Sequence, residues 1–277
     1  MLNQYGRVIL ELHDYCNRNC EWCIRNICNI NSISYMSKET LFITLNEIYK
    51  NIHLFNLPLT FSLFRYNEPL YDIDNLLFVS SSIKEFFNSK NIDTFIYIHT
   101  NGDYLSENIL SKLYCIDEIR VNDYDNLLFN NIMVLNKISN ISKDIVLKKI
   151  KNIDNERDQV ICKYKNLDII FYKMSEKDLL KMSKGSSLKQ YCNNIRNYMC
   201  DLKGKILVVE CNGDVMECCE VYNKFKEHSR FIIGNIVDGI QSFVNKYNKI
   251  NELNDKICKY CNMSSKSCEI IRKKYDS

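Results

Sequence analysis

The sequence predicts an α/β fold: a partial (β/α)6 barrel of the TIM type, followed by a small cysteine-rich extension. Two observations lead to this prediction. Short apolar, β-rich runs alternate with segments of helical periodicity, and eight of the fourteen cysteines fall between residues 192 and 268. The length of 277 residues suits one barrel-like domain with a short addition. We therefore assign residues 1–184 to the barrel and residues 185–277 to the extension.

Six segments have the composition of strands, and helices fill several of the gaps between them. Residues 38–54 and 75–90 repeat apolar side chains with helical spacing, and Ser106 can cap a helix that runs through Leu113. Strands joined through helices pair in parallel by right-handed crossovers, and six of them predict a partial barrel rather than an eightfold one. The predicted strands are residues 7–12, 59–64, 94–99, 118–122, 145–150 and 168–172.

Segments rich in polar residues or cysteines follow the first three predicted strands. Residues 16–23 hold three cysteines, residues 65–69 read Arg-Tyr-Asn-Glu-Pro, and residues 100–102 read Thr-Asn-Gly. Ligands of parallel sheets bind at the carboxyl ends of the strands. We therefore expect these three segments to share one pocket.

The predicted extension contains a hairpin. Residues 206–210 and 215–218 flank Asn212-Gly213, a dipeptide that is typical of tight β-turns. A helix is expected over residues 240–247, and Cys258 and Cys261 follow in the tail. These features indicate a small appendage organised by its cysteines.

Composition and charge favour an intracellular globular protein. Hydrophobic residues make up 46% of the chain, charged residues 26%, and the net charge is only +3, so there is no case for binding nucleic acid or an anionic membrane surface. No apolar run approaches the roughly 18 residues of a membrane helix. Residues 1–7 lack the layout of a secretory signal. We expect a cytoplasmic location.

The cysteines are clustered in a way that favours metal binding. In a cytosolic chain of this size, such clusters more often hold metal than form disulfides. The first cluster reads CxxxCxxC within residues 16–23. Three thiolates can hold an iron–sulfur cubane and leave one iron open, whereas zinc favours four protein ligands in paired CxxC knuckles. The isolated Cys28, Cys115 and Cys162 are expected to be buried small side chains.

The first cluster, with Trp22 directly before its last cysteine, resembles the loop of the radical S-adenosylmethionine (SAM) superfamily. The resemblance implies that Cys16, Cys20 and Cys23 bind a 4Fe–4S cluster whose open iron chelates SAM. In this family a GGEP-type segment after the second strand binds the methionine amino group; here only its Glu-Pro is kept. A surface turn is the alternative interpretation of that segment. The expected cofactor-binding residues are Trp22, Tyr66, Asn67, Glu68, Pro69 and Asn101.

The second cluster resembles the CX9–15GX4C opening of the SPASM pattern, through Cys200, Gly213 and Cys218. After this opening the pattern continues with few cysteines, so it is closer to the truncated twitch version of the domain, which holds one auxiliary 4Fe–4S cluster. The resemblance implies Cys200, Cys218, Cys258 and Cys261 as the four ligands, with a structural zinc at these positions as the alternative. The surplus cysteines are Cys192, Cys211, Cys219 and Cys268, and replacement of one ligand by Cys192 or Cys268 stays open.

Over nearly its full length the chain also resembles small radical SAM dehydrogenases of the kind that oxidise 2-deoxy-scyllo-inosamine in butirosin biosynthesis. Segments 61–70, 98–105 and 234–236 carry this resemblance, as does the step from Cys200 to Cys218. Those enzymes line the substrate pocket with Asn-Arg-Gly-Gly, where this chain reads Ser-Lys184-Gly-Ser. Lysine lacks the planar fork of arginine, so the substrate need not be the same.

The resemblance implies a radical SAM oxidoreductase with two 4Fe–4S clusters. It would cleave SAM to a 5′-deoxyadenosyl radical that abstracts hydrogen from a small polar substrate, a sugar or an aminocyclitol alcohol. The auxiliary cluster would accept the remaining electron, and a flavodoxin or ferredoxin-type protein would supply reductant. A base must also take the hydroxyl proton, and Lys184, His99 and Arg65 are the candidates.

Three other functions stay open. The same chemistry modifies ribosomal peptides, although the segment before Cys16 is too short for a leader-binding domain. Redox-neutral epimerisation or decarboxylation of a sugar is the second alternative; an epimerase needs a hydrogen-atom donor, and Cys219 beside a predicted cluster ligand could be one. The third is a non-catalytic zinc protein, which predicts zinc without iron.

Overall fold

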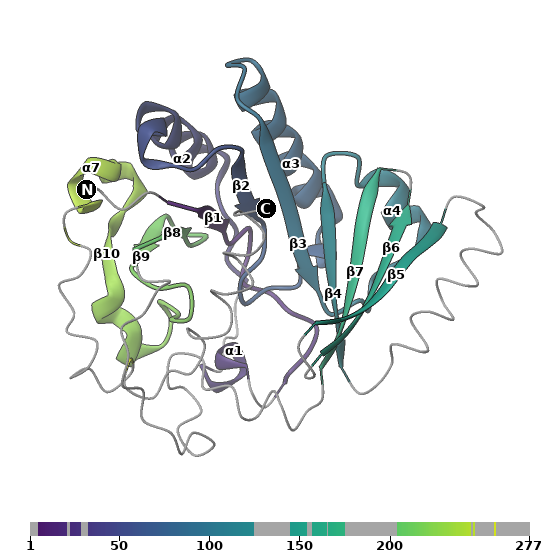
Figure 1. Cartoon of the computed structure of the whole chain (residues 1–277). Helices are drawn as coiled ribbons and strands as arrows, with labels where there is room; N and C mark the ends of the chain where they lie inside the picture. The colour runs from purple at the N-terminus through teal and green to yellow at the C-terminus, as the bar shows by residue number, and fades with distance from the viewer. Residues whose placement is uncertain are drawn as a thin grey trace.

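A computed structural model gives the architecture of the chain (Figure 1). It describes residues 5–20, 23–28, 33–124, 145–153, 157–164, 166–174, 204–244, 246 and 258. Within these ranges, ten strands form one sheet in the order β10-β9-β8-β1-β2-β3-β4-β7-β6-β5. The strands are β1 Arg7–Leu10, β2 Leu59–Ser62, β3 Thr94–Thr100, β4 Glu118–Tyr124, β5 Ile145–Ile153, β6 Arg157–Tyr164, β7 Leu167–Met174, β8 Ile206–Val209, β9 Asp214–Met216 and β10 Ile232–Asn235.

The centre of the sheet is parallel. β8, β1, β2, β3, β4 and β7 are parallel neighbours in that order. At one edge β9 and β10 continue the sheet antiparallel from β8, and at the other edge β6 and β5 do so from β7. Because parallel strands end at the same edge of a sheet, the segments that follow β1, β2, β3 and β8 emerge on one side.

The prediction of an α/β fold is confirmed, but the pairing predicted for residues 145–150 is wrong. This strand exists as β5, and it pairs antiparallel with β6 at the sheet edge instead of entering a parallel unit. β6 itself was not predicted. Three residues separate β5 from β6 and two separate β6 from β7, which is too short for a parallel crossover, so these strands form a meander.

β8 pairs in parallel with β1, although its sequence was assigned to the extension; Leu10 lies opposite Val209. The hairpin predicted around Asn212-Gly213 is confirmed, because β8 and β9 pair antiparallel and Gly213 has a φ of +85°, which favours glycine. The boundary predicted between residues 184 and 185 lies outside the described residues. Closure of the sheet into a partial barrel stays a prediction.

Three capped helices cover one face of the parallel strands. At the start of α2 (Lys38–Lys50) the hydroxyl of Ser37 accepts a hydrogen bond from Thr40 N at 2.9 Å, and at the start of α3 (Ile73–Asn88) the carboxylate of Asp72 accepts one from Asn75 N at 3.1 Å. At the start of α4 (Glu107–Lys112) Ser106 accepts one from Ile109 N at 3.3 Å, as its sequence predicted. No helix in the described ranges combines the length and apolar character needed to cross a membrane. The helices are α1 Ile24–Ile27, α2 Lys38–Lys50, α3 Ile73–Asn88, α4 Glu107–Lys112 and α7 Ile240–Val244, with short 3-10 segments at Ile52–Leu54, Pro69–Tyr71, Lys226–Phe231 and Ile236–Asp238.

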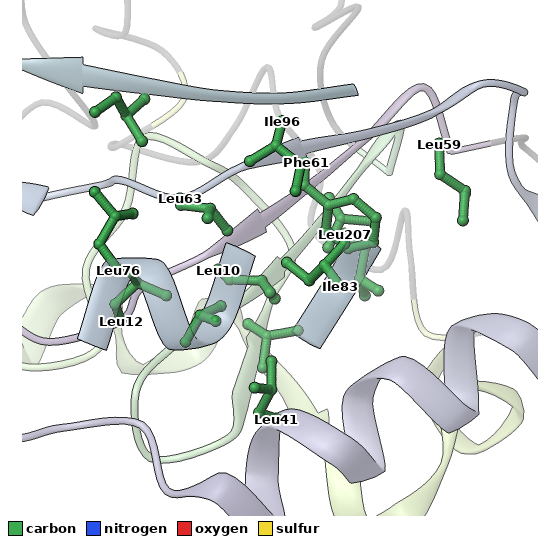
Figure 2. Packing of buried hydrophobic residues seen from close by; sticks show 14 of the residues in the cluster. Leu10, Leu12, Leu41, Leu59, Phe61, Leu63, Leu76, Ile83, Ile96 and Leu207 are labelled. Atoms are coloured by element: carbon green, nitrogen blue, oxygen red, sulfur yellow. The ribbon is translucent and has the colours of Figure 1, made fainter. Parts of the chain in front are cut away.

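The main hydrophobic core lies between α2, α3 and α4 on one side and the parallel strands on the other. Leu41 of α2, Ile83 of α3 and Phe61 of β2 belong to one buried cluster (Figure 2). Successive residues of a strand point to opposite faces of the sheet. Accordingly, Leu10 of β1 joins this core, whereas Ile9 belongs to a second, smaller cluster on the other face. That second face is free of helices α2 and α3 and carries the candidate site.

We expect Leu45→Ala to lower the free energy of unfolding by about 2–5 kcal/mol, because it empties a fully buried position between α2 and the sheet. The control is Phe42→Ala in the same helix, where the side chain is 41% exposed against 0% for Leu45. The control should change stability by about 0.5 kcal/mol or less. Chemical denaturation of both variants measures the difference, and equal losses would contradict the placement of α2.

Candidate active site

The loop between β1 and α1 carries three half-buried thiols. None of Cys16, Cys20 and Cys23 is in a disulfide, and Cys23 N donates a hydrogen bond to Cys20 O at 3.0 Å just before α1 begins. Within the described residues, no three metal-binding side chains already converge on one point. The case for a cluster therefore rests on the donor set: three thiols on one short loop fit a cubane that keeps one open iron.

The cysteine loop is pinned to the segment that follows β3. Arg18 donates two hydrogen bonds to Asp103, at 2.8 Å and 2.6 Å, and Asn17 Nδ2 donates another at 2.7 Å. The Arg18 hydrogen bond lowers the pKa of Asp103 below its ordinary value. Asn101 Nδ2 donates to Asn17 Oδ1 at 2.8 Å and lies 3.9 Å from Cys16 Sγ. The predicted association of these two strand ends is confirmed by these contacts.

Glu68 joins the end of β2 to both neighbouring segments. Its buried carboxylate accepts hydrogen bonds from Thr100 Oγ1 at 2.6 Å, Asn101 N at 2.8 Å and Leu70 N at 3.1 Å. Its backbone N donates to Tyr15 O at 2.8 Å, directly before the cysteine loop. Burial raises the pKa of Glu68 to about 7, although the hydrogen bonds oppose that shift. Both carboxylate oxygens are thus occupied by the protein itself.

The neighbours of Glu68 are buried, which contradicts the alternative interpretation of this segment as a surface turn. Asn67 and Pro69 are both buried, and Pro69 begins a 3-10 turn that Glu68 caps. Tyr66 packs with Ile24 and Cys23. The Tyr66 hydroxyl and Asn67 Nδ2 have no hydrogen-bond partner within the described structure. Unpaired buried polar atoms next to a three-cysteine loop fit a site that binds a polar cofactor.

Two of the four predicted auxiliary ligands, Cys218 and Cys258, are associated with one buried cluster beside the β8–β9 hairpin. Cys258 is 9% exposed and lies in a buried cluster with Val208 and Met216, and Cys218 and Cys219 pack against that cluster. The other two predicted ligands, Cys200 and Cys261, lie outside the described residues, as do Trp22 and Lys184. Cys219 Sγ donates to the neighbouring Glu220 carboxylate at 3.6 Å.

The face of the sheet opposite the helices carries polar and aromatic side chains. Arg7 donates a hydrogen bond to Tyr97 OH, and the guanidinium of Arg120 lies 4.1 Å from the centre of the same ring while it pairs with Glu118. The ring of His99, a base candidate, stacks on Phe64 with centroids 4.1 Å apart. This face is therefore suited to a polar ligand.

Arg7 and Arg120 were not predicted as site residues, although the alternation of side chains along β1 and β4 indicates that both lie on this face. Both alternate with core residues along β1 and β4, so their side chains point away from the helices. Arg65, another base candidate, is held by Glu210 and by the carbonyl of Val221. Burial is the largest single effect and opposes the charge of Arg65, but Glu210 and the neighbouring Tyr66 and Glu11 together outweigh burial and raise the pKa of Arg65 above its ordinary value, so Arg65 is unsuited to act as a base.

No protein-family model matches the sequence, and curated protein sequences contain no relative that matches it. Solved structures do resemble it. BtrN in complex with AdoMet and 2-DOIA aligns with a TM-score of 0.64 at 19% identity, covering 95% of this chain and 94% of BtrN. The chain has the fold of BtrN. BtrN in an open conformation aligns over the same shares with a TM-score of 0.56 at 18% identity.

This likeness confirms, at the level of the fold, the resemblance to the butirosin radical SAM dehydrogenase, which BtrN is. Native anSMEcpe with bound AdoMet aligns with a TM-score of 0.43 at 13% identity, covering 92% of this chain and 87% of anSMEcpe. That score is too low for a comparison of the two folds. The agreement with BtrN extends over nearly the full length of both chains.

We expect Glu68→Ala to lower the free energy of unfolding by about 1–3 kcal/mol, because the Thr100 hydroxyl and the Asn101 amide lose their buried acceptor. Urea denaturation of the cofactor-free protein measures this loss. The matched control is Glu85→Ala, an exposed glutamate in the last turn of α3, which should be nearly neutral. Equal stability of the two variants would mean that Glu68 does not hold the strand ends together.

Proposed function

We propose that the protein is a radical SAM enzyme. The observation that carries the proposal is the three-cysteine loop, which hydrogen bonds tie to the ends of β2 and β3 in the fold of BtrN. BtrN was solved with AdoMet bound. When bound, a 4Fe–4S cluster supplies the electron that cleaves SAM to a 5′-deoxyadenosyl radical.

The residues of this chain divide into ligands and supports. Cys16, Cys20 and Cys23 would hold the first cluster. Glu68 holds residues 66–69 in place through its hydrogen bonds with Thr100 and Asn101. The Tyr66 hydroxyl and the Asn67 amide, which have no partner in the described structure, would then bind polar groups of SAM. The remaining proposed SAM contacts are Trp22, Pro69 and Asn101.

A small polar substrate, a sugar or an aminocyclitol alcohol, fits the face that carries Arg7, Tyr97 and Arg120. Guanidinium and phenol groups donate hydrogen bonds that hydroxyl-rich molecules accept. Arg7 and Tyr66 both lie near enough to Cys219 to interact with it electrostatically. We therefore place the substrate between the cysteine loop and this part of the sheet. Lys184 and His99 stay candidates for the base that takes the hydroxyl proton.

Oxidation of the substrate is the outcome we favour. It leaves one electron to be removed, and an auxiliary 4Fe–4S cluster at Cys200, Cys218, Cys258 and Cys261 would accept it. The packing of Cys218 against the buried cluster that contains Cys258 supports this ligand set. A flavodoxin or ferredoxin-type protein would supply the electron that starts each turnover.

Redox-neutral epimerisation is the second candidate, and the position of Cys219 favours it. This half-buried thiol packs at the margin of the smaller buried cluster and interacts electrostatically with Arg7 and Tyr66. A thiol so placed can return a hydrogen atom to a substrate radical. The two outcomes therefore depend on different cysteines: the proposed cluster ligands for oxidation and Cys219 for epimerisation.

Anaerobically reconstituted protein should contain about eight irons, as two cubanes require. Replacing Cys16, Cys20 and Cys23 together with alanine should leave about four irons and abolish cleavage of SAM. Cys28→Ala is the matched control, because Cys28 lies beside the same loop but outside the proposed ligand set, and it should keep about eight irons. Iron analysis and chromatography of 5′-deoxyadenosine test this, and cleavage retained by the triple variant would refute the proposal.

Cys258→Ala and Cys219→Ala should separate oxidation from epimerisation. If the enzyme oxidises its substrate, Cys258→Ala stops product formation while uncoupled cleavage of SAM persists, and Cys219→Ala retains turnover with about eight irons. If it is an epimerase, Cys219→Ala is the variant that stalls. Product mass measured in deuterium oxide decides between them: one solvent deuterium without a change in oxidation level would overturn oxidation.

A further inference from the structure

Three ionisable side chains are buried together where β1, β2 and β8 end. Glu11 follows β1 and Glu210 follows β8, at neighbouring positions of two paired parallel strands, and both are 0% exposed. Arg65 follows β2, and its side chain is 3% exposed. The function proposed above gives a role to none of these three residues.

The hydrogen bonds within this group are unevenly distributed. Arg65 donates to Glu210 Oε1 and to the carbonyl of Val221, and Asn223 N donates to the same Glu210 oxygen at 3.3 Å. Neither oxygen of Glu11 receives a hydrogen bond within the described structure, nor does Glu210 Oε2. Buried polar atoms without partners are costly, and unpaired buried charges are costlier. One guanidinium therefore faces two carboxyl groups, and three of their oxygens lack a donor.

The surrounding titratable groups do not supply the missing donor. Lys224, in the turn after β9, interacts electrostatically with Glu11, but its ammonium is paired with the buried Asp14. Tyr222 and Cys211 also interact electrostatically with Glu11, and burial raises the pKa of each above its ordinary value, so both keep their protons; neither donates to a Glu11 oxygen in the described structure. The hydroxyl of Tyr222 is itself unpaired in the described structure.

We propose that Glu11 is a carboxylic acid in the folded protein and donates its proton to the free oxygen of Glu210, so that Glu11, Glu210 and Arg65 form a clamp. The two carboxyl groups are within hydrogen-bond reach of each other. Such a bond exists only when one of the two holds a proton, because two carboxylates are both acceptors. The ion pair with Arg65 keeps the negative charge on Glu210, so the proton resides on Glu11.

The clamp positions the turn that carries Cys218 and Cys219. Arg65 directly precedes the proposed SAM-binding segment, and the carbonyl of Val221 that it binds lies two residues after Cys219. The rings of Tyr66 and Tyr222, one from each segment, pack with centroids 5.0 Å apart. This positioning role rests on the proposed function, whereas the protonated pair does not.

The clamp is closed at neutral pH and opens at alkaline pH. Burial, followed by the charge of Glu210, raises the pKa of Glu11 from 4.5 to about 8. Because the pKa is higher in the folded protein than in the unfolded chain, the proton stabilises the fold fully below about 4.5, and this contribution is lost as the pH rises to about 8. Above that pH two buried carboxylates face each other and repel.

Infrared spectroscopy of the reconstituted protein tests the proton directly. Wild-type protein should show a carboxylic acid carbonyl band that disappears with a midpoint near pH 8. Glu11→Gln should lack this component at every pH, because its amide donates to Glu210 in place of the acid. Glu118→Gln removes another buried carboxyl from the same face and should keep the component. A wild-type protein without an acid band that titrates near pH 8, or a Glu11→Gln variant that retains it, would overturn the proposal.

Amide hydrogen exchange tests the positioning role. After correction for the intrinsic effect of pH, exchange over residues 218–223 should accelerate above about pH 8 in the wild type and stay flat in Glu11→Gln. The same acceleration in both proteins would mean that the pair does not hold the turn. Neither measurement needs SAM or a substrate. The clamp is therefore tested separately from the proposed radical SAM chemistry, which iron analysis and SAM cleavage test.

Discussion

The carboxylate of Glu68 is the interaction on which the arrangement of the site depends. It receives its hydrogen bonds from Thr100 and Asn101 at the end of β3, and its own backbone is bonded to Tyr15 at the start of the cysteine loop. Three segments that lie far apart in the sequence therefore meet around one buried side chain. A buried carboxylate is tolerated only when donors surround it, so the segments cannot separate without exposing or unpairing it.

The two faces of the sheet carry different kinds of side chain: apolar ones that form the main core and polar ones that face away from it. Side chains such as Leu10, Phe61 and Ile96 point toward α2 and α3 and form the main core (Figure 2). The alternate positions hold Arg7, Tyr97 and other polar groups on the face without those helices. Because successive residues of a strand point to opposite faces, each strand contributes both to the core and to the polar face. A shift of register by one residue would exchange the side chains of the two faces.

Much of the fold could be predicted from the sequence, and the errors have physical causes. Most of the strands, though not β6 or β10, and the capped helix after Ser106 were evident from periodicity and cap chemistry. The direction of β5 was not, because an apolar run does not reveal its partner; only the short connections on either side of β6 indicate a meander. In the site, the motif identified Glu68 as important but suggested a cofactor contact, whereas its oxygens are bound by the protein. Glu11 and Glu210 were missed because a glutamate at a strand end is usually solvated, and their burial depends on pairing between β1 and β8.

The parallel pairing of β8 with β1 also governs when the fold can be completed. Leu10 and Val209 lie about 200 residues apart in the chain, so this pairing has a very high sequence separation. Contacts of that kind form late, because a long loop must close before they give any stabilisation. During synthesis on the ribosome, the β8 side of β1 stays without its partner until most of the chain has emerged. An unpaired strand edge invites association with other chains. The order of strands in this sheet thus leaves one edge of β1 open to such association until β8 is available.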